Sequence, residues 1–330
     1  MKSITFRCEV VTPMFLAGAN GKTPELRPPS IKGAMRFWWR AVHGHWPIED
    51  KKDDDGNIIE KGLITQEAEI FGGGGDIAKR SLFSIRVLSD LTQRTNEKPL
   101  PHHSGDEKCN YLNLSNSCRG IKTWNKDKCQ KGRRQPSISS GVFFIELKGR
   151  GLEQNKALFI LSCLLGGLGK RSRRGFGSLI ISGIKSNSQD CFDAFDMPKT
   201  LDEILYFMSL FNTDYQIGHS SASLKIFLTK SSYPERQYPY IEEIQIGNNV
   251  YPDYSDLLHK VGTATHDFKN DDPSLGYAKR RDRFASPVFV SALKYGANDY
   301  RAIITTLHMA EINDQPVNRQ KQEDFKNAIL

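Results

Sequence analysis

Residues 142–184 read VFFIELKGRGLEQNKALFILSCLLGGLGKRSRRGFGSLIISGI. Their pattern predicts a strand over residues 142–148, a helix over residues 153–165 and a second strand over residues 178–184. Between the helix and the last strand lies a glycine-rich loop, residues 166–177. Strands and a helix that follow one another this closely predict an α+β fold.

The chain before this unit supplies the rest of a domain. Residues 3–12 alternate apolar and polar side chains as a strand does, a helix is expected to begin with Ser30 as its N-cap, and residues 82–88 alternate again. The resulting order of strand, helix, strand, strand, helix, strand is the βαββαβ pattern of a ferredoxin-like domain.

The second half predicts another α+β domain, because 330 residues exceed the usual size of a single domain. We place the boundary between residues 186 and 187, so that the domains are residues 1–186 and 187–330. The elements expected in the second domain are a helix at 201–211, strands at 224–229 and 240–246, a short helix at 254–261, strands at 288–295 and 300–309, and a last helix at 319–329.

Charge and hydropathy favour an anionic partner. The chain has 46 Lys and Arg against 38 Asp and Glu, a net charge of +8, which favours nucleic acid over a membrane. Its longest apolar run, residues 157–165, is far shorter than the roughly 20 residues of a membrane-spanning helix. The N-terminal segment alternates like a strand instead of forming a signal peptide, so we expect a cytoplasmic protein with reduced cysteines.

The glycine-rich loop is the first candidate site. Five glycines, among them Gly169 and Gly175, frame the cations Lys170, Arg171, Arg173 and Arg174 and the aromatic Phe176. Glycine lets the backbone approach a ligand, and amide and guanidinium groups donate hydrogen bonds to phosphate oxygens. The loop therefore predicts a polyphosphate clamp, most simply for RNA. The alternative is a solvated basic loop in which the glycines only form turns.

The helix that follows Arg27 is the second candidate site. Its apolar residues recur at helical spacing and predict a buried stripe formed by Ile31, Met35, Trp38 and Val42. A neighbouring stripe collects cations and an aromatic, namely Lys32, Arg36, Trp39, Arg40 and His43. Cations on consecutive turns repel one another unless an anion lies across them, so this stripe predicts a phosphate track. The alternative is a solvated face on which Trp39 is partly packed.

Three segments outside these elements carry weaker signals. We assign no chemistry to the charged insertion at 49–61 and interpret it as a flexible, solvated loop, and we expect residues 92–140 to be a long excursion, partly disordered without a partner. A basic patch before residue 284 includes Arg281 and Arg283, and its alternative is a solvated hinge. The excursion holds possible zinc ligands, although the gaps between its cysteines do not match zinc-site spacing, so we expect no metal and no cofactor. Those residues are His102, His103, Cys109, Cys118 and Cys129.

Several motifs together resemble the RAMP superfamily of CRISPR-associated proteins, and within it the family of first RAMP subunits of the Cmr module in type III-B effector complexes. The segments that carry the resemblance are TPMFLAGA (12–19), ELRPPSIKGAMRFWWRAVHG (25–44), EAEIFGG (67–73) with Ser81, the glycine-rich loop and RFASPVFV (283–290). They extend over nearly the whole chain. The insertions at 49–61 and 92–140 have no counterpart that the resemblance explains.

The resemblance implies two tandem ferredoxin-like (RRM-like) domains with long loop insertions, and a non-catalytic subunit at the head of a ribonucleoprotein. It implies guide RNA and target RNA as partners, beside other RAMP subunits, with contact near the 3′ part of the guide. The RNA-binding surface would comprise the glycine-rich loop together with Arg27, Lys32, Arg36, Trp39 and Arg40. In such complexes, target cleavage is attributed to a different subunit.

Two alternatives remain open at the level of sequence. A metal-independent endoribonuclease would need a histidine as general acid or base beside the cations, and His43, followed by His45, is the candidate nearest the basic helix. A purely architectural subunit would contact only protein. If RNA is bound, Trp39 or Phe176 is expected to stack on a base.

Overall fold

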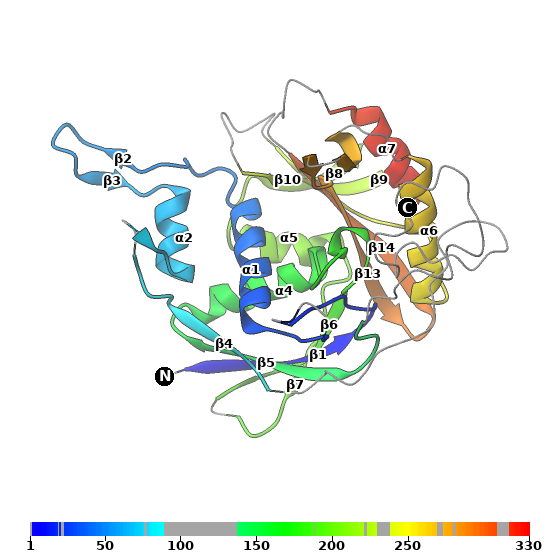
Figure 1. Cartoon of the computed structure of the whole chain (residues 1–330), viewed down its shortest axis with the longest axis horizontal. Coiled ribbons are helices and arrows are strands. Elements are labelled where there is room, and N and C mark those ends of the chain that lie inside the picture. Colours follow the sequence, from blue (N-terminus) through cyan, green and yellow to red (C-terminus); the bar gives the residue numbers. More distant parts are fainter. Residues whose placement is uncertain are drawn as a thin grey trace.

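The computed structural model describes residues 2–18, 20, 23–75, 78–88, 137–187, 189–220, 223–229, 238–268, 273–279, 282–308 and 317–330. Two five-stranded sheets and the helices packed on them make up this part of the chain (Figure 1). The zinc-ligand candidates between His102 and Cys129, and Arg281, lie outside the described residues. Within the described ranges, no group of three metal-ligating side chains is found. No described helix is long and apolar enough to span a membrane.

In the first half, the predicted strands and helices follow one another along the chain in the predicted order, and the strands form the first sheet. Its strands lie in the order β4 (Phe83–Val87), β5 (Val142–Gly149), β1 (Ser3–Val10), β6 (Leu179–Ser186) and β7 (Asp193–Ala194). Every neighbouring pair is antiparallel. Along the chain, helix α1 (Pro28–Val42) lies between β1 and β4, and helix α4 (Leu152–Leu165) lies between β5 and β6. The strand, helix, strand, strand, helix, strand sequence is therefore present in the first half.

The second sheet is built differently from the first. Its order is β13 (Val288–Gly296), β14 (Asp299–His308), β10 (Tyr240–Ile246), β9 (Ser223–Leu228) and β8 (Tyr215–Ser220). Helix α5 (Leu201–Ser209) precedes β8, α6 (Tyr254–Asp267) connects β10 toward β13, and α7 (Arg319–Asn327) follows β14. Two strands precede β10, so the described elements of this half do not repeat the βαββαβ order along the chain. The edge strand β8, YQIGHS, was not predicted because its apolar alternation is too short.

Helices α1, α4 and α5 lie between the two sheets, whereas α6 and α7 lie on the outer side of the second sheet (Figure 1). This position explains the composition of α4, in which every residue from 157 to 165 is buried. A helix that is apolar on all sides must be covered on all sides, and α4 contacts strands of both sheets. The rings of Trp38 on α1 and Phe289 on β13 pack 5.0 Å apart, so one apolar core joins the two halves.

Helix α1 begins earlier than predicted. Its first residue is Pro28 and its N-cap is Arg27, which makes no side-chain capping hydrogen bond, while Ser30 lies inside the first turn. Proline has no amide hydrogen and its φ is already close to the helical value, so two prolines fit the first turn of a helix. The pair therefore starts the helix instead of preceding it.

The charged insertion at 49–61 is a β-hairpin and not an irregular loop. Its strands are β2 (Lys51–Lys52) and β3 (Ile58–Glu60), and helix α2 (Leu63–Phe71) follows at once. The segment of the predicted basic patch before residue 284 contains a second hairpin, β11 (Tyr277–Lys279) and β12 (Asp282–Phe284). Both hairpins are too short to show strand periodicity in the sequence.

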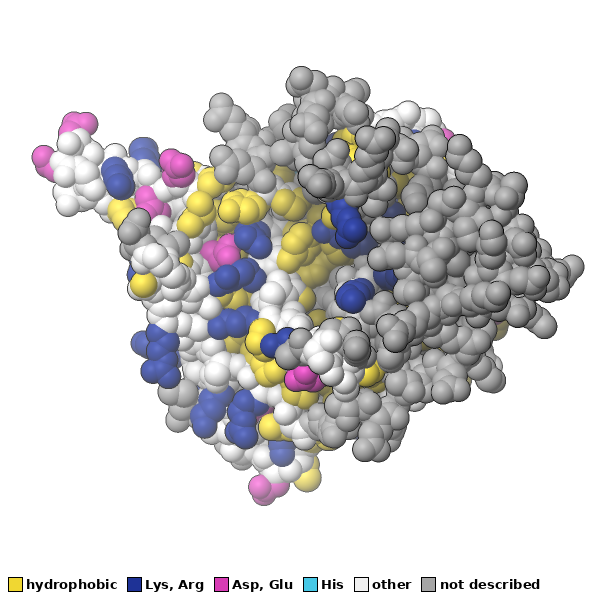
Figure 2. All heavy atoms as spheres, viewed as in Figure 1, with side chains coloured by type: hydrophobic (Ala, Val, Ile, Leu, Met, Phe, Trp, Pro, Cys, Tyr) yellow, Lys and Arg dark blue, Asp and Glu magenta, His cyan; other side chains and the backbone are white. Residues whose placement is uncertain are grey.

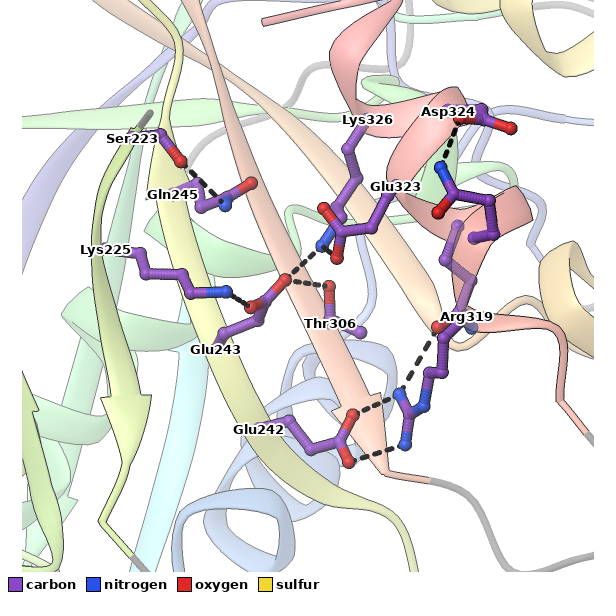
Figure 3. Close-up of polar contacts among 12 residues, drawn as sticks. Ser223, Lys225, Glu242, Glu243, Gln245, Thr306, Arg319, Glu323, Asp324 and Lys326 are labelled. Carbon is purple, nitrogen blue, oxygen red and sulfur yellow. Dashed lines mark hydrogen bonds and ion pairs between the residues drawn. The ribbon is translucent and has the colours of Figure 1, made fainter. Parts of the chain in front are cut away.

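Ion pairs fix α7 on the second sheet (Figure 3). Arg319 binds Glu242 of β10 through two hydrogen bonds, one of them 2.7 Å long. Lys326 is 1% exposed and its ammonium group contacts the carboxylates of Glu243 and Glu323. A buried charge is tolerated only when it is paired, so these contacts determine where α7 lies.

Candidate nucleic-acid interface

The glycine-rich loop folds back on itself and is tightly packed. The amide of Leu168 donates to the carbonyl of Gly177 (2.9 Å), and a Cβ at Gly177, where φ is +73°, would lie 1.9 Å from the carbonyl oxygen of Leu168. A Cβ at Gly169 would lie 2.8 Å from the carbonyl oxygen of Phe15. The amide of Gly175 donates to Val290 of β13 (2.7 Å). These glycines are required for close contact between parts of this chain.

Arg174 extends from the loop into the second half of the molecule. Its Nη1 donates to the hydroxyl of Ser286 (3.1 Å) and the carbonyl of Val288 (2.9 Å), and its Nη2 donates to the carbonyl of Leu275 (2.9 Å). The guanidinium also lies 5.1 Å from the ring centroid of Phe325 on α7. All of these partners belong to this chain, so Arg174 holds the loop against β13 and α7.

Arg173 is packed in a similar way. Its Nη1 donates to the carbonyl of Ser286, and its guanidinium lies 4.4 Å from the ring centroid of Phe289 and 5.7 Å from that of Phe37 on α1. Burial lowers the pKa of Arg173 to about 10, which leaves it protonated at neutral pH. The side chain therefore brings a positive charge to the junction of the loop, α1 and β13.

Trp39 and Phe176 are core residues, contrary to the expectation that one of them stacks on a base. Phe176 is fully buried, and its ring lies 5.1 Å from that of Phe15. Trp39 is 2% exposed and packs against Trp46 and Phe71. Neither ring has a face open to a ligand. The sequence spacing placed Trp39 beside the cations but could not show that α2 covers it.

The remaining predicted cations of this region are closer to the surface. Lys170 is exposed, and Arg171, at a φ of +66°, has its guanidinium 5.5 Å from the ring centroid of Phe15. Arg283 on β12 is exposed and Arg27 is partly exposed at the start of α1. Lys170 and Arg283 therefore leave charge at the surface of the loop and its surroundings, whereas Arg171 is partly buried and its Nη1 is enclosed by protein.

Helix α1 carries the row of cations that the sequence predicted, and we call Lys32, Arg36 and Arg40 the α1 cation row. The Nε of Arg36 lies 3.0 Å from one carboxylate oxygen of Glu67, and the Nη1 of Arg40 lies 3.5 Å from the other. Arg36 also donates to the carbonyl of Gly72 (2.6 Å). Both arginine side chains keep about a third of their surface exposed, at 36% and 27%.

Partial burial shifts the pKa values of charged groups in the α1 cation row and beside it. Burial raises the pKa of Glu67 above its ordinary value, against the opposing effect of Arg40 and Arg36. Burial, and then the charge of Arg36, lower the pKa of Lys32, whose ammonium lies 5.2 Å from the ring centroid of Phe83. One carboxylate therefore balances two guanidinium groups, and the row keeps a net positive charge.

Figure 2 shows Lys and Arg side chains along α1, with hydrophobic side chains beside them. Phe37 of α1 is partly buried, and sequence reasoning did not select it. Its ring lies 5.5 Å from that of Phe289, and the guanidinium of Arg173 lies 5.7 Å from its centroid. Phe37 lies three residues before Arg40, so helical spacing could have placed it beside that end of the cation row.

His43 is not placed for acid–base catalysis. It is 4% exposed, and its Nδ1 lies 2.7 Å from the carbonyl oxygen of Trp39, which can only accept, so Nδ1 carries the hydrogen. Burial lowers the pKa of His43 to about 4, the hydrogen bond to Trp39 opposes that shift, and His45 adds to it. Its ring packs 4.0 Å from that of Trp46, inside the core. The endoribonuclease alternative therefore loses its nearest candidate base.

Comparison with solved structures shows the same fold in Cmr proteins. The crystal structure of Cmr1 from Pyrococcus furiosus in its apo form matches with a TM-score of 0.55 and 19% identity, covering 100% of this chain and 96% of that one. A chain in the cryo-EM structure of the type III-B Cmr-beta complex bound to cognate target RNA matches with a TM-score of 0.55 and 12% identity, covering 100% of both chains.

Sequence comparison gives the family. The curated CRISPR system Cmr subunit Cmr1-2 of Pyrococcus furiosus is 28% identical over 197 residues, which cover 56% of this chain and 98% of that protein. The sequence profile of the RAMP superfamily matches residues 7–180, a range that contains α1, the cation row and the whole glycine-rich loop. Because this match covers more than half of the sequence, the chain belongs to the RAMP superfamily.

Proposed function

We propose that this chain is a non-catalytic, RNA-binding subunit of a cytoplasmic type III-B CRISPR effector complex. Its ligands would be guide RNA, near the 3′ part, and target RNA, and its neighbours would be other RAMP subunits of a Cmr complex. The family, the similarity to Cmr1-2 and the fold shared with a chain of a target-RNA-bound complex support this proposal. The two halves, residues 1–186 and 187–330, would correspond to two ferredoxin-like domains, the second with a rearranged strand order.

The observation that carries the proposal is the α1 cation row. Lys32, Arg36 and Arg40 lie on successive turns of one helix, and two of them share a single carboxylate. Arg173, in contact with Phe37, extends the positive charge from α1 to the glycine-rich loop, where Lys170 is exposed. Such an array contacts phosphates without reading sequence, and pairing between guide and target would supply specificity.

Phe37 is the aromatic residue we assign to base contact, in place of Trp39 and Phe176. It is partly exposed, follows Arg36 on α1 and has the guanidinium of Arg173 5.7 Å from its ring centroid, so a nucleotide whose phosphate meets the row would have its base near this ring. Stacking of a base on an aromatic side chain contributes about 1–3 kcal/mol. Arg27 and Arg283, at the start of α1 and on β12, would extend the phosphate contacts.

The test is binding of a fluorescent single-stranded RNA across a salt series. If about six phosphates are engaged, the slope of log K against log salt is near −4, from roughly −0.7 per phosphate. A Lys32→Ala/Lys170→Ala variant should flatten the slope by about 1.4. Its matched control is Lys185→Ala/Lys260→Ala, on β6 and α6, which should leave the slope unchanged. A wild-type slope near zero would refute direct RNA binding.

We replace lysines in this binding experiment because the arginines of the α1 cation row also stabilise the fold. Arg36 binds Glu67 and Gly72 of the α2 region, so its removal would disturb α2 as well as RNA contact. Lys32 makes only a ring contact with Phe83 among its described interactions, and Lys170 is exposed. Removing these two lysines therefore tests charge without loosening the packing of α2 on α1.

The non-catalytic part of the proposal has its own test. His43 is buried and neutral at physiological pH, so it supplies no base to a ribose hydroxyl. Purified protein should leave a labelled RNA intact in EDTA. Cleavage that survives EDTA and disappears in His43→Ala would instead identify a metal-independent ribonuclease.

A further inference from the structure

The hairpin formed by β2 and β3, which we call the arm (residues 51–60), stands clear of both sheets (Figures 1 and 2). Every residue from 51 to 61 is exposed, so the arm has no core of its own. A two-stranded hairpin without a packed face is only marginally stable in water. The arm must therefore be ordered by contacts at its two ends.

Those contacts are present at the root and at the tip. At the root, the carboxylate of Asp50 accepts from the amide of Gly62 (2.7 Å) and from the hydroxyl of Thr65 (2.8 Å). At the tip, the carboxylate of Asp53 accepts from the amides of Asn57 (2.7 Å) and Asp55 (3.1 Å). The arm is thus shaped before it meets a partner, which reduces the entropy lost on binding.

Two large apolar side chains are exposed on the arm. Ile58 is 48% exposed and Ile59 is 58% exposed, and they are consecutive residues of β3. The register between β2 and β3 shifts at this point, because Ile58 lies opposite Lys52 and Glu60 lies opposite Lys51, so Ile59 is the extra residue of a bulge. A partner that removes both isoleucines from water must present an apolar surface to this end of the arm, as the floor of a groove does.

The charge of the tip distinguishes between classes of partner. Asp53, Asp54 and Asp55 follow one another there and are all exposed. Three adjacent carboxylates repel the phosphates of RNA, whereas the α1 cation row attracts them. Lys51 and Lys52 at the start of the arm offset part of this charge, but against Asp53, Asp54, Asp55 and Glu60 they leave the arm with a net charge of −2. The acidic tip and the exposed isoleucines are therefore complementary to a basic protein surface with an apolar floor.

We propose that the arm inserts Ile58 and Ile59 into an apolar groove with a basic rim on a neighbouring protein subunit. This inference rests on the proposed function in one respect, namely that the chain is part of a multisubunit complex. It adds that the contact made by residues 51–60 is with protein and not with RNA.

Photocrosslinking in the reconstituted complex tests which class of partner is present. p-Benzoylphenylalanine at position 59 of the full chain, assembled with the other subunits and guide RNA, should crosslink to one protein subunit, and Ile58→Asp should abolish that crosslink. The matched control position is Val250, 53% exposed and far from the arm in sequence, which should not give the same product. Crosslinks to RNA, to a second copy of this chain or to nothing would each overturn the inference.

A second measurement separates this inference from the proposed function. Ile58→Asp/Ile59→Asp should lower incorporation into the complex about tenfold, as loss of an interface anchor does, while Ile58→Val/Ile59→Val should incorporate normally. RNA affinity of the isolated double-Asp chain should equal that of wild type. Wild-type incorporation by the double-Asp variant would overturn the arm inference alone. Failure of the wild-type chain to incorporate would overturn the proposed function and the inference together.

Discussion

Glu67 determines how much charge the α1 cation row offers to a phosphate. Its carboxylate is 13% exposed and contacts both Arg36 and Arg40. Phosphate and carboxylate compete for the same guanidinium donors. We therefore predict that Glu67→Gln, which keeps an oxygen acceptor but removes the negative charge, raises RNA affinity about two- to fivefold at low salt, with a steeper salt dependence.

The control for this change lies on the same helix. Glu69 of α2 is paired with Lys61 and Lys79 instead of with α1. Glu69→Gln removes the same charge from α2 but leaves Arg36 and Arg40 as they are. Equal gains in affinity for both variants would show that net charge alone is responsible. No gain for Glu67→Gln would contradict competition at the row.

His43 makes stability depend on pH in a defined window. Its folded-state pKa is lowered to about 4 from 6.5, so the unfolded chain binds a proton that the folded chain excludes. The stability associated with neutral His43 is full above pH 6.5 and is lost as pH falls toward 4. We predict a loss of about 2 kcal/mol between pH 7 and pH 5 from this residue.

Urea unfolding of wild type and His43→Gln at both pH values measures this contribution. The variant lacks the imidazole, so its stability should change less between pH 7 and pH 5, by about the same 2 kcal/mol. Other groups that titrate in this range affect both proteins equally. Parallel pH profiles would mean that the pKa of His43 is the same in the folded and the unfolded chain.

At the scale of elements, the glycine-rich loop joins the first sheet to the second. Arg174 makes hydrogen bonds to Ser286, Val288 and Leu275, whereas Lys170 of the same loop is exposed. Removing Arg174 takes the donor from the carbonyl of Leu275, and one of two donors each from the Ser286 hydroxyl and the Val288 carbonyl. A buried acceptor left without a donor costs about 1–3 kcal/mol. We predict that Arg174→Ala lowers the free energy of unfolding by about 2–4 kcal/mol, and that Lys170→Ala changes it by less than about 0.5.

Both the free energy of unfolding, by denaturant titration, and the affinity for RNA are measured for the two variants. If the loop were only a phosphate clamp, both substitutions would weaken RNA binding and neither would alter stability. We expect instead that Lys170→Ala weakens RNA binding without changing the free energy of unfolding. A stability loss below about 0.5 kcal/mol for Arg174→Ala would contradict the structural role.

The sequence predicted elements well where a strand or helix buries a regular face. Strand β10 was predicted with its observed bounds, and α4 to within one residue, because their apolar patterns are set by the core. Strand β8 and the arm were missed, since short edge strands are formed through hydrogen bonds to a neighbour and not through their own periodicity. The candidate site shows the same limit: the spacing found the cations but not that Arg173 and Arg174 turn inward and Phe176 is buried.

At the scale of the whole molecule, α4 is the helix against which the sheets of both halves pack. It lies between the two sheets, and its buried residues contact strands from each of them. Trp38 on α1 and Phe289 on β13 extend the same core across the junction. Two halves that share a core this large are not expected to unfold one at a time, because exposing either sheet also exposes one side of α4.

Native-state hydrogen exchange can test this coupling directly. Peptides from β1 and β5 of the first sheet should open with the same free energy as peptides from β10 and β14 of the second. Leu161→Ala, which removes a fully buried side chain of α4, should lower that free energy by about 2–5 kcal/mol in both sheets. Lys156→Ala, near the start of α4, removes a side chain that is 33% exposed and paired with Glu153 on the same helix, and should lower it in neither sheet by more than about 0.5 kcal/mol. Destabilisation of the first sheet alone would show that α4 belongs energetically to one half and that the second sheet folds without it.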